Sequence, residues 1–249
     1  MVQYETFTDA GTREINEDRY GAAIFQDSYC FAVADGLGGH GNGEAAAQAA
    51  VDAICMTYAD EGYSDQFFAR AFSAAQAAIL EQQEQMHAPS RMKTTIVVLV
   101  IRDGKAVWAH IGDSRLYCIR RGRVRTRTID HSVPQMLALS GGIKEMDIRH
   151  HPDRNRLMRV MGVRGEEPNY EVSPVMRLHG ETAFLLCTDG FWELIEDEEM
   201  ARLQKESDTP ESWLRKMASV VGKNGGSEMD NYTAIAVYAK GNRFLGKQV

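Results

Sequence analysis

Three aspartates lie beside apolar stretches of the chain that have the length and composition of buried strands. Asp35 and Asp189 each end such a stretch and are followed directly by Gly36 and Gly190, and Asp230 comes just before the last such stretch. Because glycine has no side chain, a small charged group can approach the backbone closely at these points. Three strand-end aspartates that lie far apart in the sequence predict one shared site for a hard cation.

Other acids join this set, namely Glu17 and Asp18 in an early turn and Asp113 between two strand-like runs. Carboxylates gathered without histidine or cysteine at ligand spacing favour Mg²⁺ or Mn²⁺ over Zn²⁺. Such acids cannot all stay ionised side by side unless cations neutralise them. Two ions roughly 3.5–4 Å apart would share a water, lower its pKa and supply a hydroxide for hydrolysis of a phosphate ester. Taken singly, each aspartate is more often a surface group or turn former, so the prediction rests on the joint pattern.

The net charge of −7 argues against nucleic acid as a partner, because phosphate contacts need clustered lysine and arginine. One basic run, residues 120–127, departs from this balance. Its alternation fits two strands joined by a glycine turn, with a solvated basic face. A docking patch for an acidic or phosphorylated partner is the alternative.

The four cysteines, at positions 30, 55, 118 and 187, lie in apolar stretches without a Cys-x-x-Cys pair, which predicts buried thiols in a reducing compartment. The first residues carry neither the basic nor the apolar region of a secretion signal. The longest β-like apolar run, 96–101, is far shorter than the roughly 20 residues that span a bilayer. We therefore expect a cytoplasmic protein that does not enter the membrane.

Hydrophobic periodicity predicts an α+β chain. Strands are expected at 3–8, 19–25, 29–34, 94–101, 106–111, 116–120, 124–129, 170–177, 182–188 and 233–238, and helices at 42–59, 64–86, 131–140, 197–206 and 210–222. Ser64 and Thr209 are the expected N-caps of two helices. The strands between 94 and 129 are expected to form a meander of hairpins, with Asp113 at a hairpin tip. Grouped helices and grouped strands favour antiparallel sheets with helices on their outer faces.

No linker, repeat or low-complexity segment interrupts the chain, so residues 1–240 are expected to form a single domain. The segment 141–168 is polar, basic and irregular, and is expected to be a mobile loop or flap. Residues 241–249 are expected to be a short tail.

Eight short motifs follow one another along the chain. They are Arg13-x-x-Asn16-Glu17-Asp18, Asp35-Gly36-x-Gly38-Gly39-His40, Thr94-Thr95, Gly112-Asp113-Ser114-Arg115, Asp130-His131-Ser132, Asn155-x-Leu157-x-Arg159-x-x-Gly162, Asp189-Gly190 and Asp230-Asn231. Their order and spacing resemble the metal-dependent protein phosphatase family (PPM, protein phosphatase 2C-like) in its compact bacterial form. The resemblance extends from about Phe7 to Tyr238.

The resemblance implies a four-layer α-β-β-α sandwich of two antiparallel sheets flanked by helix pairs, with metals in a cleft at one end. It implies roles for seven acidic or glycine positions and one arginine. Asp35, Asp189, Asp230 and the Gly36 carbonyl match metal ligands, Glu17 and Asp18 match acids that hold metal-bound waters, Asp113 with Asp189 matches a third metal site, and Arg13 matches the phosphate clamp. A guanidinium suits the last role because it pairs bidentately with phosphate oxygens. The segment 141–168 matches the flap beside the cleft.

Three positions depart from the family pattern. Lys93 stands where glycine usually precedes the paired threonines, and Met158 stands where threonine is usual. Leu37 occupies the position at which animal members carry a histidine proposed as the general acid, and His40 lies three residues later. The leaving-group acid is therefore open between His40 and a metal-bound water, and His131 is expected to be structural.

The expected function is hydrolysis of phosphoserine and phosphothreonine in proteins by a metal-bridging hydroxide in a binuclear Mn²⁺ or Mg²⁺ centre, with a third ion as an option. A non-catalytic phosphoprotein-binding relative is the alternative, although such relatives usually lack one or more of the acids. A two-metal nuclease or phosphodiesterase is a third candidate, which the acidic surface disfavours. The expected partners are a serine/threonine kinase and its substrates, and we expect a monomer.

Overall fold

Two antiparallel sheets pack face to face in this computed structural model, which describes residues 1–38, 42–87 and 91–241. The five-stranded sheet has the order β1 (Val2–Asp9), β13 (Tyr232–Lys240), β12 (Glu181–Cys187), β8 (Arg115–Ile119), β9 (Val124–Arg127). The second sheet has the order β10 (Glu171–Val172), β7 (Lys105–Ile111), β6 (Ile96–Arg102), β3 (Ser28–Ala34), β2 (Arg19–Phe25), with β11 (Met176–Arg177) also on β7. A two-stranded piece joins β4 (Gly36–Leu37) to β5 (Lys93–Thr94).

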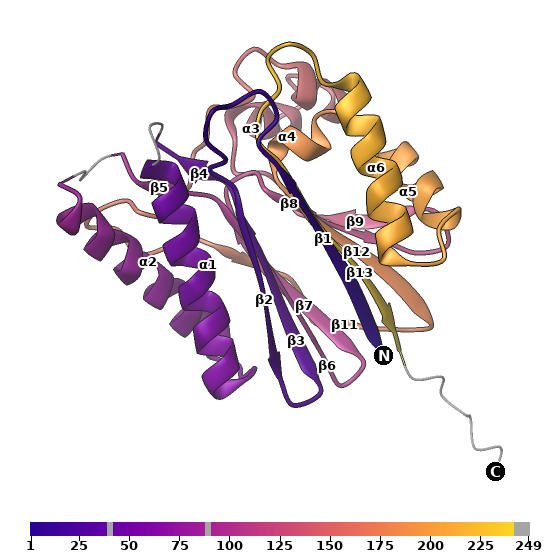
Figure 1. The fold of residues 1–249 in the computed structure, drawn as a ribbon, viewed down its shortest axis with the longest axis horizontal. Helices are drawn as coiled ribbons and strands as arrows, with labels where there is room; N and C mark the ends of the chain where they lie inside the picture. The colour runs from indigo at the N-terminus through magenta and orange to yellow at the C-terminus, as the bar shows by residue number, and fades with distance from the viewer. Residues whose placement is uncertain (39–41, 88–90, 242–249) are drawn as a thin grey trace.

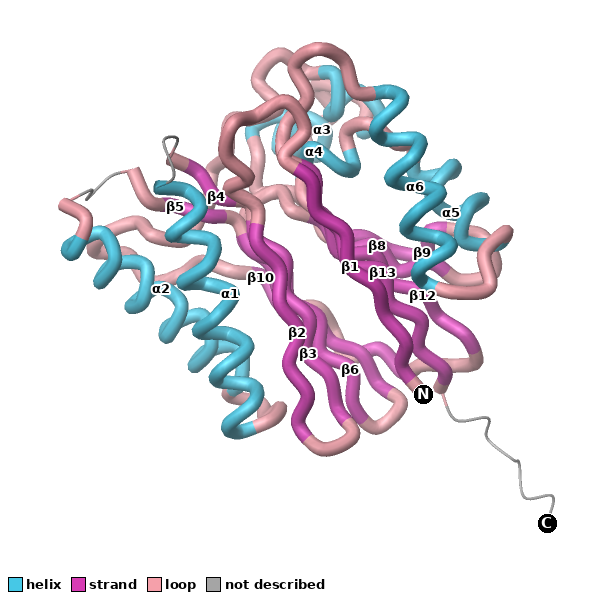
Figure 2. The backbone as a smooth tube through the Cα atoms, in the orientation of Figure 1, coloured by secondary structure: helices cyan, strands magenta, loops and turns pink. Residues whose placement is uncertain are grey.

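Helices cover the outer face of each sheet. The pair α1 (Asn42–Glu61) and α2 (Phe67–Gln85) covers the sheet that contains β2 and β3, and α5 (Asp197–Lys205) and α6 (Pro210–Asn224) cover the other sheet (Figure 1). Shorter helical turns, α3 (Val133–Leu139), α4 (Asp189–Trp192) and a 3₁₀ turn at Glu145–His150, lie near one end of the sandwich (Figure 2). The expected four-layer α+β sandwich is therefore confirmed.

Strand periodicity explains why the central strands are apolar throughout. On β3, Phe31 and Val33 face the core between the two sheets, whereas Cys30, Ala32 and Ala34 face α1 and α2. Successive side chains of a strand point to opposite faces, so a strand that is covered on both faces is apolar at every position. The small side chains on the helix-facing side allow the alanine-rich α1 to pack closely.

The expected meander is wrong at its centre. The hairpin β6–β7 belongs to one sheet and the hairpin β8–β9 to the other, so the chain crosses between the sheets at Gly112–Ser114. Asp113 therefore lies at a crossing between the layers and not at a hairpin tip. Turn signals mark where a strand ends, but they do not specify which strand the next one pairs with.

Smaller differences concern the ends of elements. Helix α2 begins at Phe67 after Gln66, so Ser64 is not its N-cap. The expected strand 170–177 is instead two short pieces, β10 and β11, that pair with β7. Thr209 is confirmed as an N-cap, because its side chain accepts a hydrogen bond from the Ser212 N–H, and α6 continues to Asn224. Over the described ranges, every helix is too short or too polar to cross a bilayer.

Candidate functional site

The strand-end acids meet at one end of the sandwich. Strands β3 and β12 end there, β13 begins there, and α4 lies beside them at the upper end in Figure 1. A hollow of about 500 Å³ opens at this end between the two sheets. Its lining includes the acids Glu17, Asp35, Asp113, Asp189 and Asp230, together with Arg13 and Gly36. The structure therefore brings six of the positions singled out from the sequence as candidate metal ligands, and the candidate clamp, to one place.

Paired threonine hydroxyls fix the position of Asp35. Thr94 Oγ1 donates to the Asp35 carbonyl at 2.8 Å, and Thr95 N–H donates to the same oxygen at 2.9 Å. In return, the Asp35 N–H donates to Thr95 Oγ1 at 3.1 Å, and this hydroxyl also lies 2.7 Å from Ser114 Oγ. A chain of short contacts thus links the end of β3 to the crossing that carries Asp113.

Close backbone contact beside Asp35 requires glycine. A Cβ at Gly36 would lie 2.2 Å from the Gly43 carbonyl oxygen and 2.6 Å from that of Glu17. Real side chains do not reach such distances, so the start of α1 packs directly on the backbone of the Asp35–Gly36 turn.

The early turn with Glu17 and Asp18 is held against the last strand by Asn231. Asn231 Oδ1 accepts the Glu17 N–H at 2.8 Å, and its Nδ2 donates to the carbonyls of Ala10 and Ile15 at 2.9 and 3.1 Å. Asp18 is buried, with Oδ2 accepting a hydrogen bond of 2.8 Å from Thr188 Oγ1. These contacts place Asp18 next to the residue that precedes Asp189.

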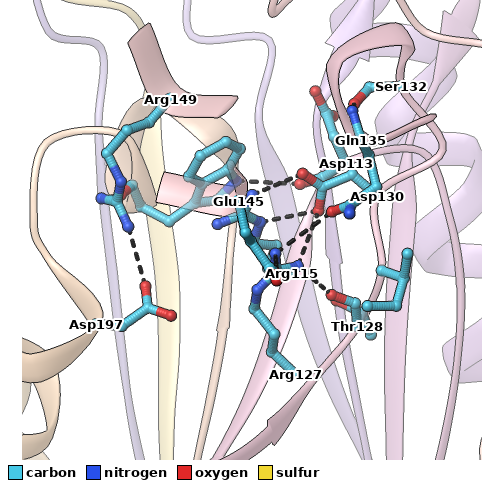
Figure 3. A network of polar contacts seen from close by, with 12 residues as sticks. Asp113, Arg115, Arg127, Thr128, Asp130, Ser132, Gln135, Glu145, Arg149 and Asp197 are labelled. Carbon is cyan, nitrogen blue, oxygen red and sulfur yellow. Dashed lines mark hydrogen bonds and ion pairs between the residues drawn. The ribbon is translucent and has the colours of Figure 1, made fainter. Parts of the chain in front are cut away.

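A buried ion pair positions the crossing at Asp113 (Figure 3). Arg115 donates to both oxygens of Asp130 at 2.8 and 2.6 Å, and its guanidinium carbon lies 3.3 Å from the centre of the Trp192 ring. Trp192 Nε1–H in turn donates to the Asp113 carbonyl at 3.0 Å. Because Trp192 ends α4, which begins at Asp189, this contact ties the backbones of two candidate ligands together.

Several acids in and beside the hollow have raised pKa values, which a bound cation would lower. Burial, followed by the repulsion of Asp189 and other acids, raises the pKa of Asp35 and of Asp113 well above the usual range of a carboxyl group. Burial also raises the pKa of Asp18 to about 7, with Asp189 and Asp230 adding to it. For Asp189, burial and then the charge of Asp230 raise the pKa to about 6. Desolvated carboxylates that repel one another favour their neutral forms unless a cation is near.

Two buried carboxylate oxygens lack a partner within the described part of the chain: Asp113 Oδ1, from a residue that lines the hollow, and Asp18 Oδ1, from the residue after Glu17. A buried polar atom without a partner is costly, and a hard divalent cation or its coordinated water would satisfy carboxylate oxygens. The residues present therefore fit Mg²⁺ or Mn²⁺ by donor chemistry, by charge and by these unpartnered atoms.

Arg13 lies at the rim of the hollow, where its Nη2 donates to Asp230 Oδ2 at 2.9 Å. Its side chain is 59% exposed, and that of Asp230 is 44% exposed. This pair is therefore well solvated and weak, so Arg13 can exchange Asp230 for another anion at little cost.

Glu193 is a site residue that the sequence reasoning missed. Burial and then the charge of Asp189 raise its pKa to about 7, and Arg154 Nε donates to its carboxylate at 3.0 Å. Arg154 belongs to the segment 141–168, so this ion pair joins that segment to α4. The only available signal was the position of Glu193 four residues after Asp189, on the same face of a helical turn.

A second group of potential ligand atoms, from His110, His131 and Glu171, lies outside the acidic hollow. His131 Nδ1 accepts the Gly112 N–H at 3.2 Å, and its Nε2 lies 3.2 Å from Glu171 Oε1. Arg159 Nη1 also lies 3.2 Å from Glu171 Oε1, and this positive charge opposes a metal cation there. Burial, His110 and Arg159 lower the pKa of His131 to about 4, which agrees with a neutral structural role.

His40, the candidate general acid, lies outside the described residues, and so does Gly39 of the same motif. The sequence analysis assigned no role to five residues that support the site, namely Thr95, Ser114, Thr188, Asn231 and Trp192. Each of them acts through hydrogen bonds to residues from distant segments, which a single sequence does not reveal.

Comparison with known proteins shows the family of this chain. Residues 10–232 match the family model described as protein phosphatase 2C. The chain is 29% identical to the serine/threonine protein phosphatase PstP of Mycobacterium tuberculosis over 94% of its length, and spans 44% of that relative. It is also 29% identical to the serine/threonine phosphatase stp of Listeria monocytogenes, covering 92% of this chain and 93% of that protein.

Among solved structures, the catalytic domain of a serine/threonine protein phosphatase PstP in complex with two manganese ions superposes with a TM-score of 0.77. It is 26% identical, and the match covers 95% of this chain and 97% of that chain. Since the family model covers most of the chain, the chain belongs to the protein phosphatase 2C family.

Proposed function

We propose that this protein is a metal-dependent phosphatase that hydrolyses phosphoserine and phosphothreonine esters in proteins, using two Mn²⁺ or Mg²⁺ ions. The observation that carries this proposal is the single hollow lined by four strand-end or crossing aspartates and Glu17, next to two buried carboxylate oxygens that lack partners. The names of the bacterial relatives support the choice of substrate class.

The acids of the hollow divide into ligands and supporting groups. We assign Asp35, Asp189, Asp230 and the Gly36 carbonyl as ligands of the two ions, Glu17 and Asp18 as holders of coordinated waters, and Asp113 with Asp189 as a third, optional ion site. When bound, the ions would neutralise these carboxylates and activate a water for attack on phosphorus. Without cations the same carboxylates would repel an anionic phosphate ester. The positive charge of the bound ions would therefore be essential for substrate binding.

Arg13 is the residue we assign to bind the phosphate oxygens. Its guanidinium stands at the mouth of the hollow and is held only by an exposed pair with Asp230. A planar guanidinium offers two parallel N–H donors to a phosphate, which fixes the orientation of the ester as well as its position.

The departing serine or threonine oxygen needs a proton, and two sources remain. His40 follows the Asp35–Gly36 turn by a few residues, and a coordinated water is the second source. A His40→Ala variant separates them, because loss of a general acid lowers kcat for an alkyl phosphate more than for an aryl phosphate, whose leaving group is a weaker base.

The experiment that tests the function compares Asp189→Asn with a matched control. Asp103→Asn makes the same chemical change in the turn after β6, at the end of that strand away from the hollow. The Asp103 side chain is 80% exposed. We expect Mn²⁺-dependent hydrolysis of p-nitrophenyl phosphate and of a phosphothreonine peptide to be lost in Asp189→Asn and kept in Asp103→Asn, with unchanged circular dichroism in both.

Three outcomes would contradict the proposal. Full activity of Asp189→Asn, or of the unaltered protein in excess EDTA, would remove the metal centre from the reaction. No turnover of any phosphomonoester at saturating Mn²⁺ would favour a non-catalytic phosphoprotein-binding relative. Hydrolysis of bis(p-nitrophenyl) phosphate without hydrolysis of the monoester would indicate a phosphodiesterase.

A further inference from the structure

The β8–β9 hairpin carries arginines without partners. Arg121, Arg123 and Arg125 are exposed, and within the described ranges their side chains form no ion pair or hydrogen bond. Arg120 is half-buried and uses its guanidinium to bind the carbonyl of His179 at 2.7 Å. The chain has a net charge of −7, so this positively charged segment has the opposite sign to the protein as a whole.

The backbone holds these arginines in a defined shape. Arg121 and Gly122 form a two-residue turn with φ of 54° and 66°, closed by reciprocal backbone hydrogen bonds of 3.0 and 3.2 Å between Arg120 and Arg123. Positive φ at both turn positions matches the twist of a tight hairpin. Farther along, Thr126 pairs with Cys118 and Val124 with Ile119, so Arg125 is the extra residue of a β-bulge. A bulge re-aims the side chain of the extra residue.

Next to the hairpin is a surface hollow of about 500 Å³, formed with the β11–β12 loop and the end of α5. Its lining includes Arg120, Arg121 and Lys205. Two acids, Glu181 and Asp208, also line it, and Glu181 already pairs with Lys240 at 3.6 Å. We call the five cations of this region, Arg120, Arg121, Arg123, Arg125 and Lys205, the basic hairpin surface.

Protection of a sheet edge explains part of this charge but not all of it. Strand β9 is the edge of its sheet opposite β1 (Figure 1), and charged residues on an edge strand prevent pairing with other chains. Arg121, however, lies in the turn beyond the edge, and Lys205 belongs to α5. The positive charge therefore extends over two elements and a hollow, which is the form of a binding surface.

We propose that the basic hairpin surface binds an acidic segment of the phosphoprotein substrate, separate from the phosphorylated residue that enters the catalytic hollow. Charge complementarity selects this partner, because within the described residues none of these five cations forms an ion pair with an acid. Arg121 lies six residues after Arg115, the neighbour of Asp113, along β8 and the turn that follows it. At ~3.3 Å per residue this separation is about 20 Å. This inference rests on the proposed function for the nature of the substrate.

A binding experiment tests the surface without catalysis. The probe is a fluorescein-labelled peptide with six glutamates, compared with a matched peptide with six glutamines by fluorescence anisotropy. The variant carries Arg121→Glu, Arg123→Glu and Arg125→Glu, and the control carries the same charge change elsewhere, at Arg70→Glu on α2, Lys105→Glu on β7 and Lys223→Glu on α6. One exposed ion pair changes a dissociation constant by a factor of roughly 1.5–5. Because the variant loses three arginines, we expect it to bind the acidic peptide about tenfold more weakly at low salt.

A kinetic experiment tests the role in substrate choice. Two phosphothreonine peptides carry either six glutamates or six glutamines beyond a Gly/Ser linker of about 13 residues, which spans about 20 Å on average. We expect the acidic peptide to have about tenfold lower KM with the unaltered protein and the control, and to lose this advantage in the hairpin variant. Activity on p-nitrophenyl phosphate should be equal in all three, and 0.5 M NaCl should remove the difference.

The outcomes separate this inference from the proposed function. If the unaltered protein hydrolyses no phosphopeptide, the function fails while the anisotropy result still decides the binding surface. Equal affinity of the unaltered protein for the two labelled peptides, or equal loss of binding in the control, would overturn the inference. Tighter binding to an RNA oligonucleotide or to anionic vesicles than to the acidic peptide would overturn the choice of partner.

Discussion

The Arg115–Asp130 ion pair permits a direct test of how the crossing at Asp113 is held. Arg115 and Asp130 side chains are 3% and 1% exposed, and two hydrogen bonds of 2.8 and 2.6 Å join them (Figure 3). Removal of one partner leaves the other charge buried and uncompensated, which costs about 3–5 kcal/mol. We therefore predict that Asp130→Asn strongly lowers the free energy of unfolding.

The expected size follows from the surroundings of the pair. The asparagine oxygen keeps one acceptor for Arg115, which reduces the loss. Arg127 Nη1 lies 3.7 Å from Asp130, so a second cation loses part of its compensation as well. For the loss in free energy of unfolding of Asp130→Asn we therefore take the lower end of this range, about 3 kcal/mol. For a chain of this length, about 3 kcal/mol corresponds to a fall in Tm of roughly 6–12 °C.

The assay is urea unfolding followed by far-ultraviolet circular dichroism, in EDTA so that metal binding does not contribute. The matched control is Glu199→Gln, because Arg202 also donates two hydrogen bonds to Glu199, at 2.8 and 2.6 Å, but these side chains are 52% and 32% exposed. An exposed pair of this kind should contribute about 1 kcal/mol or less. The two variants thus compare the same contact geometry with and without burial.

A double variant separates loss of charge compensation from loss of packing. Arg115→Met together with Asp130→Asn removes both charges, so we expect it to be more stable than Asp130→Asn alone. The reasoning from burial is refuted if Asp130→Asn lowers the free energy of unfolding no more than Glu199→Gln does. It is also refuted if the double variant loses as much free energy of unfolding as Asp130→Asn and Arg115→Met lose together.

Other measurements test the phosphate clamp, the acids of the hollow and the neutral state of His131. Arg13→Ala should raise KM for a phosphopeptide more than it changes the apparent Mn²⁺ affinity, and an unchanged KM would place the phosphate clamp elsewhere. Because the folded-state pKa values of Asp18 and Asp189, about 7 and about 6, exceed the ordinary value, their contribution to the stability of the metal-free protein is full at low pH and is lost as pH rises through 7. Mn²⁺ should therefore raise Tm more at pH 7.5 than at pH 5.5, and an equal rise would count against Asp189 as a ligand and Asp18 as a holder of coordinated water. His131, with its pKa lowered to about 4, contributes stability above pH 6.5 that is lost as pH falls towards 4, so His131→Gln should lose less stability than the unaltered protein over that range.

The sequence predicted the layers of the fold and the acids of the hollow because these depend on local patterns. The continuous apolar run of β3 indicated a strand buried on both faces, and the Asp-Gly steps after β3 and β12 indicated where the backbone must come close to other groups. Both are properties of a few adjacent residues. The convergence of Asp35, Asp189 and Asp230 followed from placing each of them at a strand end.

Pairing between strands and the supports of the site were not accessible in the same way. The turn at Gly112–Ser114 has the composition of a hairpin, yet β7 and β8 lie in different sheets. Trp192 and Thr188 support the site through bonds to Asp113 and Asp18, which lie 79 and 170 residues away along the chain. No pattern in one sequence specifies such distant partners, because many pairings satisfy the same hydrophobic periodicity.

The crossing at Gly112 makes the site depend on the packing of the two sheets. Gly112 has a φ of +100°, and a Cβ there would lie 2.5 Å from the Cβ of Thr95, so the crossing can pass Thr95 only with glycine at this position. Asp35 comes from one sheet, Asp189 from the other, and Asp113 from the segment between them. Cations bound by all three would attract both sheets to one point, and a ligand that binds only the folded state stabilises it. Metal binding and the association of the two layers should therefore strengthen each other.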